Sequence, residues 1–88
     1  MRRAVKIRYT KHALRRMRER KIPKTQVALA LREPDQLYKD LDLQVAERKT
    51  DRGNILRVYF RKENGVETVI LVITVYRTKR WGRGRIKR

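Results

Sequence analysis

The stretch ILRVYFRKENGVETVILVITVY, Ile55 to Tyr76, decides the fold, because two apolar runs flank the pair Asn64-Gly65. An Asn-Gly pair between alternating apolar residues is a strong signal for a two-residue β-hairpin turn. Such a turn would form three cross-strand pairs on one face whose six residues are all apolar, so this face is predicted to lie against the core. The predicted cross-strand pairs are Phe60 with Val69, Val58 with Leu71, and Leu56 with Ile73.

The opposite face of this hairpin is mixed in character. It carries two arginines among apolar and aromatic residues: Arg57, Arg61, Ile55, Tyr59, Ile70, Val72 and Tyr76. Such a surface is too apolar to remain bare. We expect it to be covered by the C-terminal tail with Trp81, by a second subunit in a homodimer, or by a partner peptide.

Two further strands are predicted outside the hairpin. Residues Val5 to Tyr9 alternate apolar and basic side chains, which is typical of a short half-buried strand. A strand from about Leu43 to Lys49 precedes a turn. A turn centred on Arg52-Gly53 would place Leu43 and Val45 on the core face, and we prefer that register.

Two helices are predicted between these strands. The segment TKHALRRMRERKIP, Thr10 to Pro23, has a narrow apolar side and suits an amphipathic helix with Thr10 as its N-cap. A second, more apolar helix begins near Pro23 and ends before Pro34, because proline disfavours helix in the preceding residue. The expected fold is therefore α+β with the order β-α-α-β-β-β and both helices on one face of an antiparallel sheet. The predicted domain spans residues 1–77, and residues 78–88 form a basic tail.

The charge of the chain points to its partners. Lys and Arg number 26 against 9 Asp and Glu, a net charge of +17. Both ends are polycationic, and residues 78–88 contain no acid. Heat-adapted proteins also carry many cations, but they pair them with acids that are missing here. Nucleic acid, RNA rather than DNA, is the first candidate partner, and an acidic protein is the second.

Several classes of protein are disfavoured by the composition. The longest apolar run, Val69 to Ile73, is too short to span a membrane, and no apolar segment of a secretory signal follows the N-terminus. A cytoplasmic protein without a membrane partner is expected. With one histidine and no cysteine, neither a metal site nor a cofactor is predicted, and Asp35, Asp40 and Asp42 are interpreted as a solvated turn.

The residues resemble those of a family of short bacterial and archaeal proteins classed as a domain of unknown function. The resemblance rests on a His-Ala-x-x-Arg-x-x-x-Arg helix motif and a terminal apolar strand, carried by His12, Ala13, Arg16, Arg20, Ile22, Val27, Pro34 and 72–76. Lys21 stands where glycine is common, and Pro23 where a serine or threonine cap is common. That family is similar in fold to the RelE/ParE-like toxins of toxin–antitoxin modules. The resemblance implies a RelE-like fold and, as expectations, RNA cleavage and an acidic antitoxin partner.

The side chains that metal-free RNA cleavage requires are present. Histidine or tyrosine can move protons, and arginine can stabilise the charge on phosphate. The predicted catalytic residues are His12, Arg57, Tyr76 and Arg80. The predicted nucleic-acid-binding residues are Arg16, Arg20, Arg77, Lys79, Trp81, Arg83 and Arg85. His12 also fits a purely structural role in a first helical turn, and Trp81 fits either base stacking or anchoring of the tail.

These candidates fall on two different layers of the predicted fold. His12 and Arg16 belong to the helical layer, whereas Arg57 and Tyr76 belong to the opposite face of the sheet, so two separate sites are expected unless the sheet edge joins them. Three functions remain open. They are a ribonuclease toxin that acts with or without the ribosome, a non-catalytic RNA- or DNA-binding module, and a ParE-like toxin that blocks a protein target.

Overall fold

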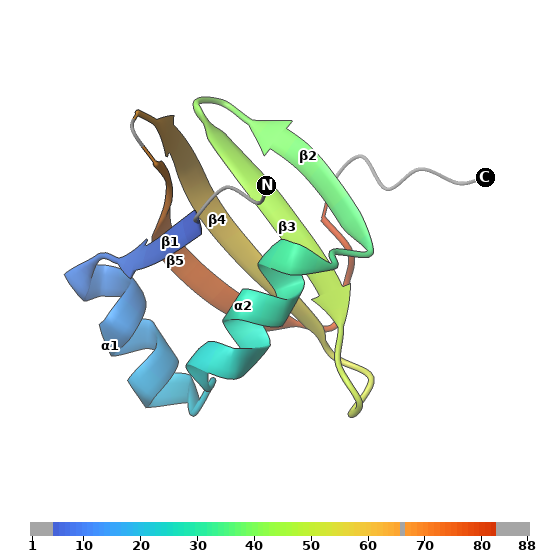
Figure 1. Ribbon diagram of the computed structural model, residues 1–88. Coiled ribbons are helices and arrows are strands. Elements are labelled where there is room, and N and C mark those ends of the chain that lie inside the picture. The colour runs from blue at the N-terminus through green and yellow to red at the C-terminus, as the bar shows by residue number, and fades with distance from the viewer. Residues whose placement is uncertain (1–4, 66, 83–88) are drawn as a thin grey trace.

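The computed structural model describes residues 5–65 and 67–82. The protein is α+β, with two helices on one face of a five-stranded sheet whose strand order is β1-β5-β4-β3-β2 (Figure 1). The elements are β1 (Val5–Tyr9), α1 (Lys11–Arg20), α2 (Lys24–Arg32), β2 (Gln36–Asp40), β3 (Leu43–Lys49), β4 (Ile55–Asn64) and β5 (Thr68–Thr78). The predicted fold class is confirmed, and β5 ends one residue inside the segment predicted as tail.

Two details of the predicted sheet are wrong. The sheet is mixed, because β1 pairs with β5 in parallel while the other neighbours are antiparallel. The chain also forms one more strand than predicted, because β2 occupies the acidic segment that we interpreted as a solvated turn. Strand β2 is short, polar and at the sheet edge, so its sequence lacks the apolar alternation that predicts a strand.

Both predicted helices are confirmed. The hydroxyl of Thr10 accepts a hydrogen bond from the backbone N–H of Ala13 at 3.0 Å, which makes it the N-cap of α1. Lys21 ends the helix in a left-handed conformation with φ 55°, a position where glycine is usually favoured. Helix α2 follows Pro23 directly and ends at Arg32, as expected from the proline two residues later.

The core lies between the two helices and the sheet. It contains Ala13 and Met17 from α1, Ile22 from the joint, Val27 and Ala30 from α2, and Leu56, Val58, Val72 and Val75 from β4 and β5. Ile7, Tyr9 and Leu31 pack at its border. Burial of each larger apolar side chain contributes roughly 1.5–3 kcal/mol, so this cluster fixes both helices on the sheet.

The predicted register of the hairpin is wrong. Pairing ends at Asn64 and Thr68, so Asn64 belongs to the strand and the loop is longer than a two-residue turn. A β-bulge between Tyr59 and Phe60 then shifts the register once more. The three residues of β4 that were expected in the core pair instead as Phe60 with Val72, Val58 with Val75, and Leu56 with Arg77.

This register changes the faces of β5. Val72 and Val75 pack among the helices, so the predicted placement of Val72 on the outer face is wrong. Ile70 pairs with Ile7, which borders the core, and is likewise misplaced in the prediction. The outer position of Tyr76 is confirmed by its pairing with Arg57, one residue away from the buried Val58.

The predicted register of β3 is also wrong. Ala46 pairs with the core residue Val58, which places Ala46 rather than Val45 on the helical face. The reason is the turn, in which the backbone N–H of Gly53 bonds the carbonyl of Thr50 at 3.0 Å and Gly53 has φ 86°. This turn is shifted by one residue from the predicted one, and a shift of one residue exchanges the two faces of a strand.

Candidate functional site

The sheet face that points away from the helices, called the open face here, carries a buried carboxylate at its centre. Glu47 on β3 is 0% exposed. Its neighbours in register are Gln36 on β2 and Arg57 on β4. The side chain of Gln36 donates a hydrogen bond to Glu47 at 2.7 Å, the Tyr38 hydroxyl donates at 3.1 Å, and Arg57 Nε donates at 2.5 Å. Three side-chain donors from β2 and β4 therefore meet at one carboxylate, because alternation along each strand places them on the same face as Glu47.

Arg57 is held by this carboxylate. Its side chain is only 19% exposed, and its ion pair with Glu47 is the one buried ion pair among the described residues. Burial acts to lower the pKa of Arg57, but the hydrogen bond and charge of Glu47 act to raise it, and the net shift is upward. Nη2 of Arg57 also donates to the carbonyl of Arg80 at 3.0 Å. These contacts give Arg57 a structural role, and its catalytic role stays a prediction.

The same carboxylate anchors the segment after β5. The chain runs back toward β3 and β2 (Figure 1), and the backbone N–H of Gly82 donates to both oxygens of Glu47, at 3.1 and 2.9 Å. A side chain at this position would have no room, because a Cβ on Gly82 would collide with the Tyr38 hydroxyl and lie 2.6 Å from a Glu47 oxygen. The tail therefore covers part of the open face, one of the covers expected from the sequence.

Replacement of Gly82 by alanine is expected to detach this segment from the sheet. The variant would lose hydrogen bonds to a charged group, which contribute roughly 1.5–3 kcal/mol each, so the free energy of unfolding should fall by about that amount. Trp81 is the only tryptophan and is half-buried, so its fluorescence should shift to longer wavelength. Gly65→Ala is the matched control, since nothing lies within 4 Å of its added Cβ. Equal spectra for both variants would contradict the anchoring.

Tyr38 contacts Glu47 as a neutral hydrogen-bond donor. Burial raises the pKa of Tyr38 to about 12, and the negative charge of Glu47 and the hydrogen bond to it act in the same direction. The hydroxyl consequently stays protonated throughout the neutral range and keeps donating to the carboxylate. Tyr38 is thus part of the anchor and is unsuited to act as a proton acceptor near pH 7.

A second cluster lies where α1 meets the edge of the sheet. Strand β1 pairs with β5 only as far as Val72. Beyond it α1 follows the edge, because the Thr10 hydroxyl donates to the carbonyl of Ile73 at 2.9 Å, and Arg77 donates to the carbonyl of Arg20 at 3.0 Å at the other end of α1. The helical layer and the open face therefore come together along this edge.

Arg16 crosses this edge. Its guanidinium carbon lies 5.2 Å from the centre of the Tyr76 ring, a cation–π contact. Tyr76 in turn meets Tyr59 edge to face, with ring centres 5.8 Å apart. Beside them Thr74 is 9% exposed, and its hydroxyl is the only buried side-chain polar atom in the described part of the chain without a hydrogen-bond partner. Arg16, Tyr59 and Tyr76 form what we call the edge cluster.

The other predicted site residues are dispersed. His12 is exposed on the first turn of α1, one helical turn before Arg16, and lies in a shallow depression with Arg15 and Arg18. Arg77 lies on the helical side, where it donates to the carbonyls that end α1, and is therefore apart from Tyr76 on the open face. Lys79 and Arg80 are exposed. Arg83 and Arg85 lie outside the described residues.

Helix α1 carries cations around most of its exposed surface, and these side chains together are called the cation strip of α1 here. Its basic side chains, with Lys21 directly after it, are Lys11, Arg15, Arg16, Arg18, Arg20 and Lys21, and its only acid is Glu19. Across residues 5–65 and 67–82, the ion pairs are Lys6 with Glu67, Arg48 with Glu33, and Arg57 with Glu47. None of these uses a cation of α1. The strip therefore remains charged and available to an external anion.

Glu47 and Gly82 are the important residues that sequence reasoning missed. Glu47 is one of several acids in the middle of the sequence, where positive and negative charges balance, and no neighbouring residue indicated that it is buried. The pair could have been found by testing the register that places Glu47 directly opposite Arg57 on the neighbouring strand, since opposite charges are favoured at such positions. The preferred turn placed the two residues out of register, so this pair was not considered.

Two classes of feature are not found in the described part of the chain. No group of three or more His, Cys, Asp or Glu side chains there could hold a metal ion. Neither α1 nor α2 has the length and apolar character needed to cross a membrane. The edge cluster itself offers one guanidinium and two phenol rings, with the imidazole of His12 one helical turn before Arg16.

Comparison with known proteins gives one match. The family described as "Domain of unknown function (DUF4258)" matches residues 9–77, from the end of β1 through Arg77 on β5. Neither the search of curated proteins nor the search of solved structures gave a match. The matched region includes α1, the edge cluster and the Glu47–Arg57 pair. The chain belongs to the DUF4258 family.

Proposed function

We propose that this protein binds RNA along α1 and the edge cluster. The observation that carries the proposal is the contact of Arg16 with Tyr76, because it joins the cation strip of α1 to aromatic rings on the open face. Cations hold the phosphates of a single strand, and aromatic rings stack on its bases. Both kinds of group are present here at one edge of the sheet.

The edge cluster can exchange its internal contact for a bound nucleotide. A base stacked on Tyr76 would displace the Arg16 guanidinium from the ring, and the freed guanidinium could then bind the adjoining phosphate in two-pronged geometry. RNA is favoured over duplex DNA because unpaired bases expose faces for stacking. The buried hydroxyl of Thr74 offers one further polar group if the tyrosine rings move apart.

We further propose that this binding belongs to a RelE-like toxin of a toxin–antitoxin module in the cytoplasm. The support is the resemblance described above, together with two helices on one face of the sheet and a basic surface that an acidic antitoxin would neutralise. A non-catalytic RNA- or DNA-binding module uses the same surface. A ParE-like toxin that blocks a protein target is the remaining alternative.

Metal-independent RNA cleavage is the second candidate function, favoured by the position of Tyr76 beside Arg16. The arginine would stabilise the charge that develops on the phosphate, and Tyr76 or His12 would transfer the proton between the 2′-hydroxyl and the leaving oxygen. His12 lies one turn from Arg16 on the same helix, so it can reach the same bound strand. Arg57 would act here by fixing β4 and the tail.

Substitutions in the edge cluster are expected to separate binding from cleavage. Arg16→Ala and Tyr76→Ala should each weaken binding of a labelled single-stranded RNA by about tenfold, since stacking contributes roughly 1–3 kcal/mol per base. Tyr76→Phe should bind normally and, if the protein is a nuclease, lose cleavage. Fluorescence anisotropy and gel analysis of the RNA, with and without ribosomes, are the measurements.

Arg32→Ala is the matched control, because it removes one exposed positive charge at the end of α2. It should leave RNA affinity nearly unchanged. If this control weakens binding as much as Arg16→Ala does, the interface does not lie at the edge cluster. If no variant and no wild-type sample cleaves RNA, the binding-module function replaces the nuclease.

A further inference from the structure

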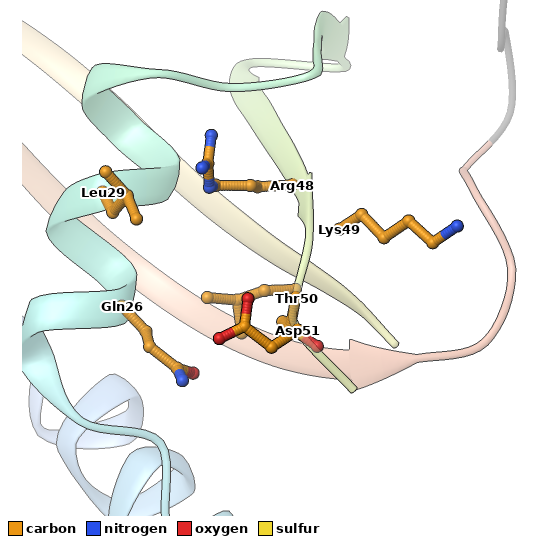
Figure 2. A pocket seen from close by; sticks show the side chains of 7 residues that line it. Gln26, Leu29, Arg48, Lys49, Thr50 and Asp51 are labelled. Carbon is orange, nitrogen blue, oxygen red and sulfur yellow. The ribbon is translucent and has the colours of Figure 1, made fainter. Parts of the chain in front are cut away.

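A groove on the helical side of the sheet is separate from the edge cluster. It consists of two adjoining pockets that share Gln26, Thr50 and Asp51. One pocket lies beside α2 (Figure 2), and the other is lined by residues at the ends of α1 and β5. The turn between β3 and β4 therefore forms a common wall for both.

The pocket near α1 is strongly basic. It has a volume of about 400 Å³ and is lined by four cations and a single acid, namely Arg20, Lys21, Arg52, Arg77 and Asp51. Arg77 is fixed there by its hydrogen bonds to the last carbonyls of α1. Crowding of like charges is unfavourable, so a bound phosphate group would relieve repulsion and gain charge-assisted hydrogen bonds.

The pocket under α2 has a different character. Its volume is about 150 Å³, which is the size of cavity that accepts a single aromatic ring. Leu29 and the buried Leu56 provide apolar walls. Figure 2 shows the side chains of Gln26 and Asp51 pointing into the space between α2 and the end of β3, whereas Lys49 points away from it. The recess thus has two apolar walls and a polar rim that carries a carboxylate, an amide and the guanidinium of Arg48.

We propose that this groove binds a guanine nucleotide, with the six-membered ring of the base in the recess under α2, the five-membered ring at the boundary with the basic pocket, and the phosphate among Arg20, Lys21 and Arg52. The base is assigned from Asp51, because an ionised carboxylate only accepts hydrogen bonds. Guanine presents two adjacent donors on one edge, its N1–H and its 2-amino group. Adenine, cytosine and uracil each place an acceptor beside a donor on that edge.

This site shares Arg20 and Lys21 with the cations of the proposed RNA interface, whereas Gln26, Asp51 and Arg52 belong to the groove alone. The edge cluster lies where α1 meets the open face, and the groove lies between α2, the β3–β4 turn and the C-terminal end of α1. The two sites are also tested with different ligands. Binding of a mononucleotide in the groove would stand even if the protein bound no RNA at the edge cluster.

The test is titration of the folded protein with guanosine monophosphate, adenosine monophosphate and inorganic phosphate, followed by ¹H–¹⁵N NMR. Guanosine monophosphate should shift the amides of Gln26 and of 50–54, and it should bind about tenfold more tightly than either other ligand. Arg52→Ala should weaken all three ligands by about tenfold. Asp51→Asn should remove the preference for guanine while binding of inorganic phosphate is kept.

Arg61→Ala is the control, since this exposed arginine lies on β4 far from the turn and should change nothing. Three results would overturn the proposal. They are equal affinity for the three ligands, shifts confined to α1 and the open face, and an Asp51→Asn variant that still prefers guanine.

Discussion

Glu47→Ala is expected to lower the free energy of unfolding by about 3–5 kcal/mol, because it leaves the partly buried Arg57 without its counter-ion. It also removes the acceptor for Gln36, Tyr38 and Gly82. Domains of this size have total stabilities of roughly 5–15 kcal/mol, so the Glu47→Ala variant should be only marginally stable. Urea denaturation followed by far-UV circular dichroism measures the change.

Two controls make this result specific to the ion pair. Glu63→Ala removes an exposed acid from β4 and should change stability by less than about 0.5 kcal/mol. Glu47→Leu combined with Arg57→Leu should recover only the part of the loss that comes from the unpaired Arg57, because Gln36, Tyr38 and Gly82 still lack their acceptor. A loss below about 1 kcal/mol for Glu47→Ala would show that the carboxylate does not hold the open face together.

The helices of this protein could be predicted from the sequence because their signals are local. The hydroxyl of Thr10 caps the backbone within the same turn, and Pro34 stops α2 through the geometry of its own ring. Alternation identified β1 as a strand, the apolar runs on both sides of Asn64-Gly65 identified β4 and β5, and β3 was predicted before a turn. These features depend on residues that are close together in sequence, so tertiary contacts changed them little.

The pairing of the strands could not be predicted, because it depends on the loops and on a bulge. The pair Asn64-Gly65 is typical of a two-residue turn, yet Asn64 belongs to β4 and pairs with Thr68, so the connecting loop begins only at Gly65. This loop exchanges the predicted faces of β5 as far as Val72, and the bulge between Tyr59 and Phe60 restores them for Val75 and Tyr76. Parallel pairing of β1 leaves no sequence signal, since the two strands are the first and last of the chain.

The edge cluster and the group of residues around Glu47 differ in how far they could be predicted from the sequence. Arg16 and Tyr76 were both predicted as functional, but on separate layers, because only the path of α1 along β5 brings them together. Glu47 was missed because its burial arises from residues of β2, β4 and the tail. A carboxylate surrounded by donors is a tertiary feature, and alternation along one strand cannot reveal it.

The central claim is that the cations of α1 bind the phosphates of RNA, and it predicts a steep salt dependence. Six basic side chains lie between Lys11 and Lys21. If each neutralises one phosphate of a single strand, the slope of log K against log salt is about −4, so affinity should fall several hundred-fold between 50 and 200 mM salt. This is the largest functional effect that we expect.

The most direct measurement is this slope in two variants of equal net charge. Replacing Arg15, Arg16 and Arg18 by glutamine removes three cations from α1, and replacing Arg32, Lys39 and Lys62 by glutamine removes three exposed cations from other elements. The first variant should make the slope shallower by about 2, and the second should leave it almost unchanged. Equal changes in both variants, or an RNA affinity independent of salt, would contradict the account.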